Sequence, residues 1–213
     1  LDRRREKSRE AHDRLADLWQ ELGEEFALGT LRSELLAQAW PCGPRVADLG
    51  CGAGFLTSML ATRSASVIGV DHSDRMLQQA RANASAAEFR RGELDALPLA
   101  EGEVHAAFAN LVWHHVPDHD AAAREVFRVI APGGVAVVSD LSPHESEWMR
   151  ERMGDLRLGV KAEDVAASLA RAGFRDLQTA RLADRYRVQS PSGEPADFPM
   201  FVVRGRRPDA ANT

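Results

Sequence analysis

Between residues 45 and 140, short apolar runs alternate with amphipathic segments. Strand-like runs, most of them apolar, predict strands over residues 45–49, 66–70, 88–91, 104–109 and 134–140. Apolar residues spaced three and four apart predict helices over residues 54–62, 73–83 and 118–130, with Ser73 and Asp118 as N-caps. Because strands that alternate with helices form a parallel sheet through right-handed crossovers, the pattern predicts an α/β protein.

The segments on either side of this alternation have different patterns. Before it, the apolar spacing predicts amphipathic helices over residues 4–26 and 30–39. After it, the pattern predicts a helix over 161–172, stopped by Gly173, and two strands over 176–188 and 198–204. We therefore expect an N-terminal helical extension or lid over residues 1–40, an α/β domain over 41–207 and a loose tail over 208–213.

Composition narrows the range of environments and partners. The chain has 213 residues, of which 44% are hydrophobic and 28% charged, as in ordinary soluble globular proteins. It contains no run of 18 apolar residues, so no membrane partner is expected. The net charge of −5 argues against direct nucleic-acid binding by this domain. Only two cysteines are present, which fits a reducing cytoplasm, whereas the oligomeric state stays open.

The most informative stretch is VADLGCGAGFLTSML, from Val46 to Leu60. Its apolar run of Val46 and Ala47 ends in an acid, Asp48, and three glycines, Gly50, Gly52 and Gly54, follow before a helix. Glycines let the backbone approach a ligand closely, and the first turn of a helix offers free N–H groups to anionic groups. A second acid, Asp71, ends the next strand about 20 residues on, as expected of a ribose-binding carboxylate. The pattern predicts a nucleotide-type site, although other nucleotide folds also use glycine-rich turns.

The D-x-G-x-G-x-G run from Asp48 to Gly54 resembles motif I of the class I S-adenosylmethionine-dependent methyltransferases, and VIGVDHSDRML (67–77) resembles their second signature. The resemblance implies a Rossmann-like, doubly wound, mostly parallel sheet with an antiparallel C-terminal strand pair. It also implies S-adenosylmethionine as cofactor, S-adenosylhomocysteine as product and a small-molecule methyl acceptor. The alternation of strands and helices leads independently to the same type of sheet.

The resemblance also assigns residues to parts of the cofactor. Gly50, Gly52 and Gly54 are expected beside the methionine portion, after Asp48, and Asp71 on the ribose hydroxyls. His72 and Met76 are expected at the adenine face, Glu93 and Leu94 near the adenine amino group, and Asn110 near the methionine portion. Glu93 departs from the Asp usual in the family. Several of these residues follow predicted strand ends, where ligands of open α/β sheets bind.

Histidines dominate the candidate acceptor side. His114, His115 and His144 are candidate general bases, because a neutral imidazole can take a proton near pH 7. His114 and His115 stand close in sequence to Asp118, His119 and Asp120, which raises the question of a metal site. No metal is expected, because Asp118 is explained as a helix cap and the two residues after it as the first helical turn.

The segment from Ser142 to Val160 carries apolar residues among charges. These residues either wall an acceptor pocket or pack on the N-terminal helices. The stretch from His144 to Leu156 resembles methyltransferase domains fused behind ArsR-type winged-helix regulators, and a start at Leu1 fits an upstream DNA-binding domain. Arsenite is not the expected acceptor, because arsenite methyltransferases rely on several thiolates and this chain has two cysteines.

Two other functions are alternatives to methyl transfer. One is a module that senses S-adenosylmethionine or S-adenosylhomocysteine for a transcriptional regulator without turnover. The other is a nicotinamide-dependent oxidoreductase. The G-x-G-x-G spacing counts against one common type of oxidoreductase, as does the lack of a Tyr-x-x-x-Lys pair, since Tyr186 is the only tyrosine. Methyl transfer to a small molecule is the leading hypothesis.

Overall fold

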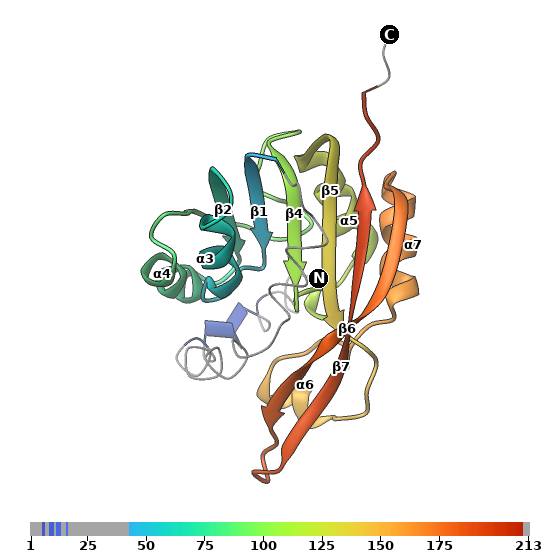
Figure 1. Cartoon of the computed structure of the whole chain (residues 1–213). Helices are drawn as coiled ribbons and strands as arrows, with labels where there is room; N and C mark the ends of the chain where they lie inside the picture. Colours follow the sequence, from blue (N-terminus) through green and yellow to red (C-terminus); the bar gives the residue numbers. More distant parts are fainter. Residues whose placement is uncertain (1–5, 7–8, 11, 14–15, 17–42, 211–213) are drawn as a thin grey trace.

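A computed structural model describes residues 6, 9–10, 12–13, 16 and 43–210. The strands form one seven-stranded sheet in the order β3-β2-β1-β4-β5-β7-β6 (Figure 1). Neighbouring strands from β3 to β5 are parallel, and β7 is antiparallel to both β5 and β6. The strands are β1 (Arg45–Leu49), β2 (Ser66–Asp71), β3 (Glu88–Arg91), β4 (Val104–Asn110), β5 (Ile130–Leu141), β6 (Arg175–Gln189) and β7 (Pro195–Arg206). This architecture confirms the predicted α/β fold with an antiparallel C-terminal pair.

Four of the described helices begin and end within a few residues of their predicted bounds, whereas α6 and the turn η1 were not predicted. The helices are α3 (Phe55–Ala61), α4 (Asp74–Asn83), α5 (His119–Val129), α6 (Trp148–Arg152) and α7 (Ala162–Ala172), with a 3-10 turn η1 (Trp113–His115). Ser73 and Asp118 cap α4 and α5 by accepting backbone N–H groups, and Gly173 ends α7 in the left-handed conformation. Most of residues 4–26 and all of 30–39 lie outside the described residues. No described helix has the length and apolar content needed to span a membrane.

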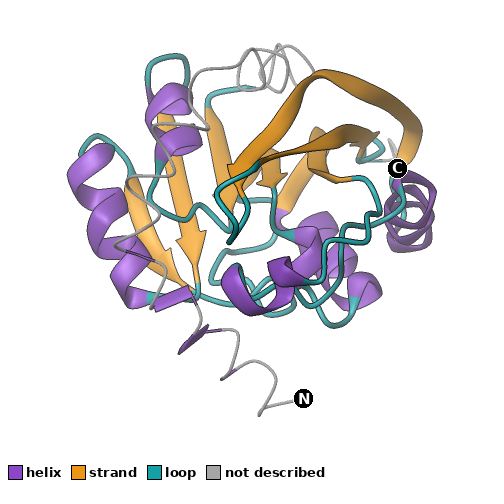
Figure 2. Ribbon diagram, turned by 90° about the horizontal axis from the view of Figure 1, so that it is seen from below, coloured by secondary structure: helices purple, strands orange, loops and turns teal. Residues whose placement is uncertain are grey.

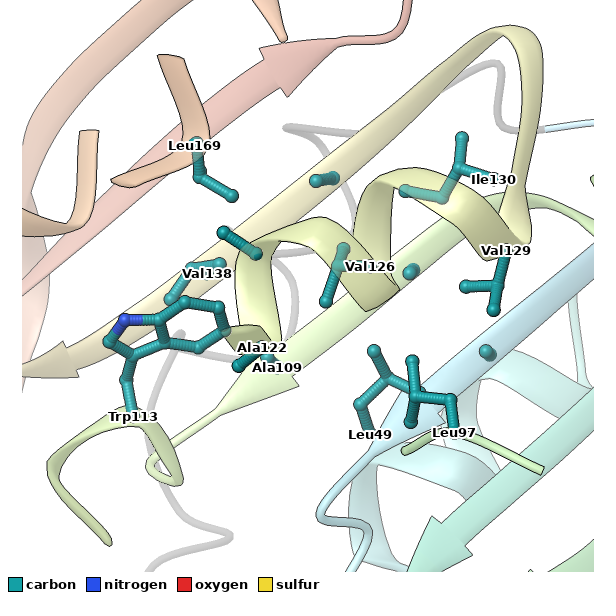
Figure 3. Close-up of a cluster of buried hydrophobic side chains, with 14 of the residues drawn as sticks. Leu49, Leu97, Ala109, Trp113, Ala122, Val126, Val129, Ile130, Val138 and Leu169 are labelled. Atoms are coloured by element: carbon teal, nitrogen blue, oxygen red, sulfur yellow. The ribbon is translucent and has the colours of Figure 1, made fainter. Parts of the chain in front are cut away.

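Apolar side chains fill both faces of the sheet, with helices on either side (Figure 2). On one face, α5 and α7 cover residues of the central strands, and Figure 3 shows Val126 of α5 and Leu169 of α7 in this cluster. Trp113 of η1 is fully buried there, which ties the segment after β4 to the core. On the other face, Leu56 and Leu60 of α3 contribute to a second cluster. The central strands are apolar on both faces because both faces are covered.

The segment over 142–160 packs on the hairpin formed by β6 and β7, a use that the sequence pattern did not indicate. The β5–β7 pairing ends at Leu141↔Met200, but the β6–β7 pairing continues to Gln189↔Pro195, so the hairpin extends beyond the sheet (Figure 1). Met149 and Met153 are buried in the same cluster as Tyr186 of this extension. Part of the apolar content of the segment therefore serves packing.

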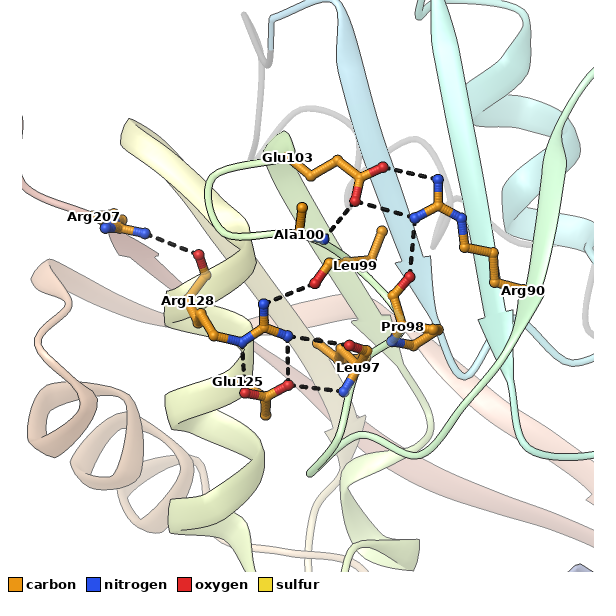
Figure 4. Close-up of polar contacts among 9 residues, drawn as sticks. All are labelled: Arg90, Leu97, Pro98, Leu99, Ala100, Glu103, Glu125, Arg128 and Arg207. Carbon is orange, nitrogen blue, oxygen red and sulfur yellow. Dashed lines mark hydrogen bonds and ion pairs between the residues drawn. The ribbon is translucent and has the colours of Figure 1, made fainter.

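Two arginines fix the loop that connects β3 to β4 (Figure 4). Arg90 donates to the carbonyl of Pro98 at 2.9 Å, and Arg128 donates to the carbonyl of Leu99 at 2.7 Å. Glu125 accepts from the backbone N–H of Leu97 at 2.8 Å. Because these contacts satisfy backbone groups from two sides, residues 97–99 are held in place where the loop returns toward the start of β4.

Candidate functional site

The glycine turn between β1 and α3 depends on left-handed backbone. The φ angles of Gly50, Gly52 and Gly54 are 71°, 51° and 83°. A Cβ on Gly50 would lie 2.4 Å from Cγ2 of Val112, and one on Gly54 would lie 3.0 Å from Cα of Ala80. The expectation that missing Cβ atoms make room for a ligand is therefore incomplete, because at these two positions protein atoms fill the space.

Asp71 links the glycine turn to the end of β2. One carboxylate oxygen accepts from the N–H of Gly52 and the other from the N–H of Ser73, both at 2.9 Å. The residue is 8% exposed. Since each carboxylate oxygen has two lone pairs, Asp71 retains acceptor capacity beyond these bonds. Its position and free acceptor sites fit a ribose diol.

Asp48 has a partner within the protein. It is buried, and Oδ2 accepts from Oγ1 of Thr57 at 2.6 Å. Thr57 lies in α3, so this bond fixes the first turns of the helix to the end of β1. The contact gives Asp48 a part in shaping the glycine turn.

Glu93 sits between two cationic groups. Its Oε1 lies 3.0 Å from Nη2 of Arg9, and its Oε2 lies 3.6 Å from Nδ1 of His72. The nearby imidazole of His72, followed by the hydrogen bond from Arg9, lowers the pKa of Glu93 to about 2. Burial alone would lower the pKa of His72, but Glu93 and Asp71 outweigh it and raise the pKa. Glu93 is therefore an ionised acceptor at this edge.

Described residues of the N-terminal segment contact the same side chains. The hydroxyl of Ser73 donates to the carboxylate of Asp13. The ring of His12 lies edge-on to His72, with centroids 5.0 Å apart, and to His115, with centroids 4.6 Å apart. These contacts agree with the position of a lid, a role that stays a prediction for residues 1–40.

The other predicted cofactor residues differ in their surroundings. Asn110 ends β4, is half-buried and accepts from Oγ of Ser139 at 2.7 Å, which keeps a polar group at the carboxyl edge. Met76 is fully buried, and Leu94 packs against the main core. Asn110 is thus placed for a polar ligand contact, whereas Met76 and Leu94 contribute packing.

His114 lies in a buried polar cluster beside η1. Its Nδ1 is 2.6 Å from Oδ1 of Asp140, and its backbone N–H donates to Oδ2 of Asp140 at 3.0 Å. Both residues are buried. Burial alone would lower the pKa of His114, but Asp140 and then Asp155 outweigh it and raise the pKa to about 10.

The sequence analysis missed Asp155, the third member of this cluster. Its Oδ1 lies 3.5 Å from Nε2 of His114 and 3.8 Å from Nε2 of His115. Asp155 is buried, in a loop after α6. Burial, and then the charge of His114, lowers the pKa of His115 well below its usual value. No local sequence signal marks Asp155, because only the fold brings it to the two histidines.

The other candidate residues, His144 and residues 118–120, have different contacts. The ring of His144 packs on Phe198, with centroids 4.4 Å apart, and burial lowers its pKa. A ring nitrogen of His119 lies 3.0 Å from the carbonyl of Trp113, and Asp120 pairs with Arg171. Asp118 caps α5 and the two residues after it lie in the first turn of that helix, as expected from the sequence. Residues 118–120 therefore do not join His114 and His115 in the buried cluster.

Comparisons with known proteins agree with this geometry. A family model described as a methyltransferase domain matches residues 47–138. The chain is 31% identical to an arsenite methyltransferase of Halobacterium salinarum, over 74% of this chain and 44% of that protein. It is 32% identical to a trans-aconitate 2-methyltransferase of Paracidovorax citrulli, over 77% of this chain and 63% of that protein. The chain thus spans less than two thirds of the length of these relatives.

Solved structures share the fold. A phosphoethanolamine N-methyltransferase 2 of Haemonchus contortus, in complex with phosphomonomethylethanolamine and S-adenosylhomocysteine, matches with a TM-score of 0.73 and 16% identity, over 95% of this chain and 60% of that chain. An S-adenosylmethionine-dependent methyltransferase from Mesorhizobium loti matches with a TM-score of 0.66 and 22% identity, over 82% of this chain and 96% of that one. The solved structures show the fold. Together with the glycine turn and the acid ending β2, the family model over residues 47–138 and the named relatives support a class I S-adenosylmethionine-dependent methyltransferase.

Proposed function

We propose that the chain transfers a methyl group from S-adenosylmethionine to a small-molecule acceptor and releases S-adenosylhomocysteine. The observation that carries the proposal is the position of Asp71, which joins the glycine turn to the end of β2 and keeps acceptor lone pairs. This is the edge where open α/β sheets bind nucleotide-type ligands. The names of the relatives support the reaction class.

The cofactor contacts follow from the chemistry of each group. Asp71 would accept hydrogen bonds from the ribose hydroxyls. Glu93, an ionised carboxylate whose side chain is 26% exposed, would accept from the adenine amino group, where the family usually has Asp. His72 lies between these two acids. Asn110 and the glycine turn would face the methionine portion, with Asp48 holding α3 in place.

The acceptor would lie on the side of the histidines. Methyl transfer is an in-line displacement at carbon, so alignment and exclusion of water are the main tasks of the protein. Where the acceptor also loses a proton, His115 or His144 is the proposed base. Both ring nitrogens of His114 face carboxylates, Asp140 and Asp155, so His114 has none left for an acceptor.

We propose a small molecule as acceptor without naming it, because the names of the relatives above give different acceptors. Arsenite is not favoured. Cys51 is buried in the glycine turn, and burial followed by the charge of Asp71 raises the pKa of its thiol well above the usual value. A thiol held protonated and shielded is a poor arsenic ligand.

Calorimetry with S-adenosylmethionine, S-adenosylhomocysteine and NAD tests the cofactor. We expect the two adenosyl ligands to bind and NAD not to bind. Preferential binding of NAD would contradict the proposal. Transfer of labelled methyl groups to a panel of small carboxylic, phenolic and amine acceptors then tests turnover. Binding with no transfer to any acceptor would favour the sensing module.

A further inference from the structure

We propose that His114, His115 and Asp155 form a binding site for a divalent transition-metal ion such as zinc. One ligand atom from each side chain lies within 4.8 Å of the others. Two of these separations are 3.5 and 3.8 Å, from Oδ1 of Asp155 to Nε2 of His114 and Nε2 of His115. Ligands about 2.0–2.1 Å from a tetrahedral metal are about 3.4 Å apart, so small side-chain shifts would close the site.

The carboxylate of Asp155 is buried without a hydrogen-bond partner among the described residues, and this needs an explanation. Its side chain is 1% exposed. The nearest imidazole nitrogen, at 3.5 Å, is too far for a strong one. The charge of His114 offers Asp155 an ion pair at this distance, but it leaves the lone pairs of the carboxylate without hydrogen bonds. Buried carboxylates are stabilised by pairing or by coordination of a metal. A cation between Asp155 and the two histidines would satisfy both its charge and its lone pairs.

Asp140 provides the support that metal-bound histidines usually have. Its Oδ1 lies 2.6 Å from Nδ1 of His114, which favours a proton on Nδ1 and turns the Nε2 lone pair toward Asp155. Asp140 is itself fixed by the backbone N–H groups of His114 and Leu141. A carboxylate that orients the far nitrogen of a histidine is the usual outer shell of a protein metal site.

Charge and ligand type indicate the class of ion. Asp140 and Asp155 are two carboxylates in one buried cluster with His114 between them. A divalent ion would take the place of the proton on Nε2 of His114 and balance both carboxylates. Imidazole nitrogens favour zinc, iron, cobalt, nickel or copper over magnesium and calcium, which prefer oxygen ligands. Three protein ligands also leave a coordination position open, as in catalytic zinc sites.

This site differs from the set of neighbouring residues that the sequence suggests. That set included Asp118, His119 and Asp120, which cap and begin α5. The present set replaces them with Asp155 from the loop after α6, near His114 only through the fold. With Nε2 of His115 engaged by a metal, His144 would remain as the candidate base. Metal binding itself does not depend on the proposed methyl transfer.

The test is a titration of the purified, chelator-treated full chain with Co²⁺ and Zn²⁺. We expect one equivalent of Co²⁺ to give the absorption of a low-symmetry site, and Zn²⁺ to displace it and raise the melting temperature. His115→Gln and Asp155→Asn should each weaken binding at least about 100-fold, and Asp140→Asn about 10- to 100-fold. The matched control is His119→Gln, which removes a neighbouring imidazole that is not in the cluster and should leave binding unchanged.

Circular dichroism of each variant separates loss of a ligand from loss of the fold. If a cluster variant unfolds, His115→Cys keeps a metal-ligating side chain and should retain binding with an altered cobalt spectrum. The proposal is overturned if the folded wild-type protein takes up no stoichiometric metal. It is equally overturned if folded His115→Gln and Asp155→Asn bind Co²⁺ as tightly as the wild type.

Discussion

Asp71 accepts a hydrogen bond from the backbone N–H of Gly52 across the gap between β2 and the glycine turn. The other oxygen of the same carboxylate accepts a hydrogen bond from the backbone N–H of Ser73, the N-cap residue of α4. The proposed ribose ligand therefore also shapes the turn that is proposed to contact the methionine portion. Loss of its side chain would affect both binding and local order.

We expect Asp71→Ala to weaken S-adenosylmethionine binding about 100-fold, because two hydrogen bonds to a charged group are worth about 3 kcal/mol in total. The fold should survive with a loss of about 1–3 kcal/mol, since two backbone N–H groups lose their acceptor. Calorimetry and urea unfolding measure the two effects. Asp74→Ala is the control, because Asp74 is exposed at the start of α4. Unchanged affinity in Asp71→Ala would remove Asp71 from the ribose site.

Gly50→Ala should be much more destabilising than Gly193→Ala. Both glycines have positive φ, so each alanine costs about 1–2 kcal/mol for its backbone conformation. At Gly50 the new Cβ would also lie 2.4 Å from Val112, whereas at Gly193 it meets nothing within 4 Å. Overpacking adds about 1–3 kcal/mol at Gly50. Urea unfolding measures the difference, and equal costs would mean that Val112 does not constrain the turn.

The cost of Glu93→Gln should depend on pH. The pKa of Glu93 falls from 4.5 to about 2 on folding, so its contribution to stability is present above pH 4.5 and disappears as the pH falls toward 2. The pKa of His72 rises from 6.5, so its contribution is full below pH 6.5 and is lost as the pH rises past its folded value. The pair therefore contributes most between about pH 4.5 and 6.5.

Unfolding of the ligand-free protein by urea at pH 6 and at pH 8 measures this dependence. Glu93→Gln should lose about 0.5–1.5 kcal/mol more at pH 6. Some cost should remain at pH 8, because Arg9 still pairs with Glu93. The double variant with His72→Gln should show no such dependence on pH. A cost for Glu93→Gln that is equal at both values would contradict the pairing.

Met149→Ala should loosen the hairpin extension from the rest of the molecule. Met149 is 1% exposed and packs in the cluster that includes Tyr186 and Phe198. Truncation of a buried methionine costs about 2–5 kcal/mol, whereas Met149→Leu keeps most of the volume and should cost less than about 1.5 kcal/mol. Hydrogen exchange of the far halves of β6 and β7 should rise in the alanine variant only. No change there would show that α6 does not support the extension.

Local rules predicted much of this molecule. Alternating patterns placed the central strands, and short-range chemistry identified Ser73 and Asp118 as caps and Gly173 as a stop. Other features depend on residues far apart in the chain. Asp155 lies beside His114 because the fold brings the loop after α6 to η1, and Glu93 meets Arg9 across 84 positions. Contacts of this kind have no characteristic spacing in the sequence, because the order of the strands and the paths of the loops determine them.

The contacts of the N-terminal segment would contribute to the measured dissociation constant of a ligand bound at this site. Arg9 holds Glu93, His12 lies against His72, and Asp13 binds Ser73, so the chain itself engages the edge where the nucleotide is proposed to lie. A ligand arriving there either takes its place beneath these residues or exchanges with them. Its measured dissociation constant then includes the free energy of rearranging the segment as well as its own contacts. Substitutions at Arg9 or Asp13 could therefore tighten or weaken binding without touching the ligand.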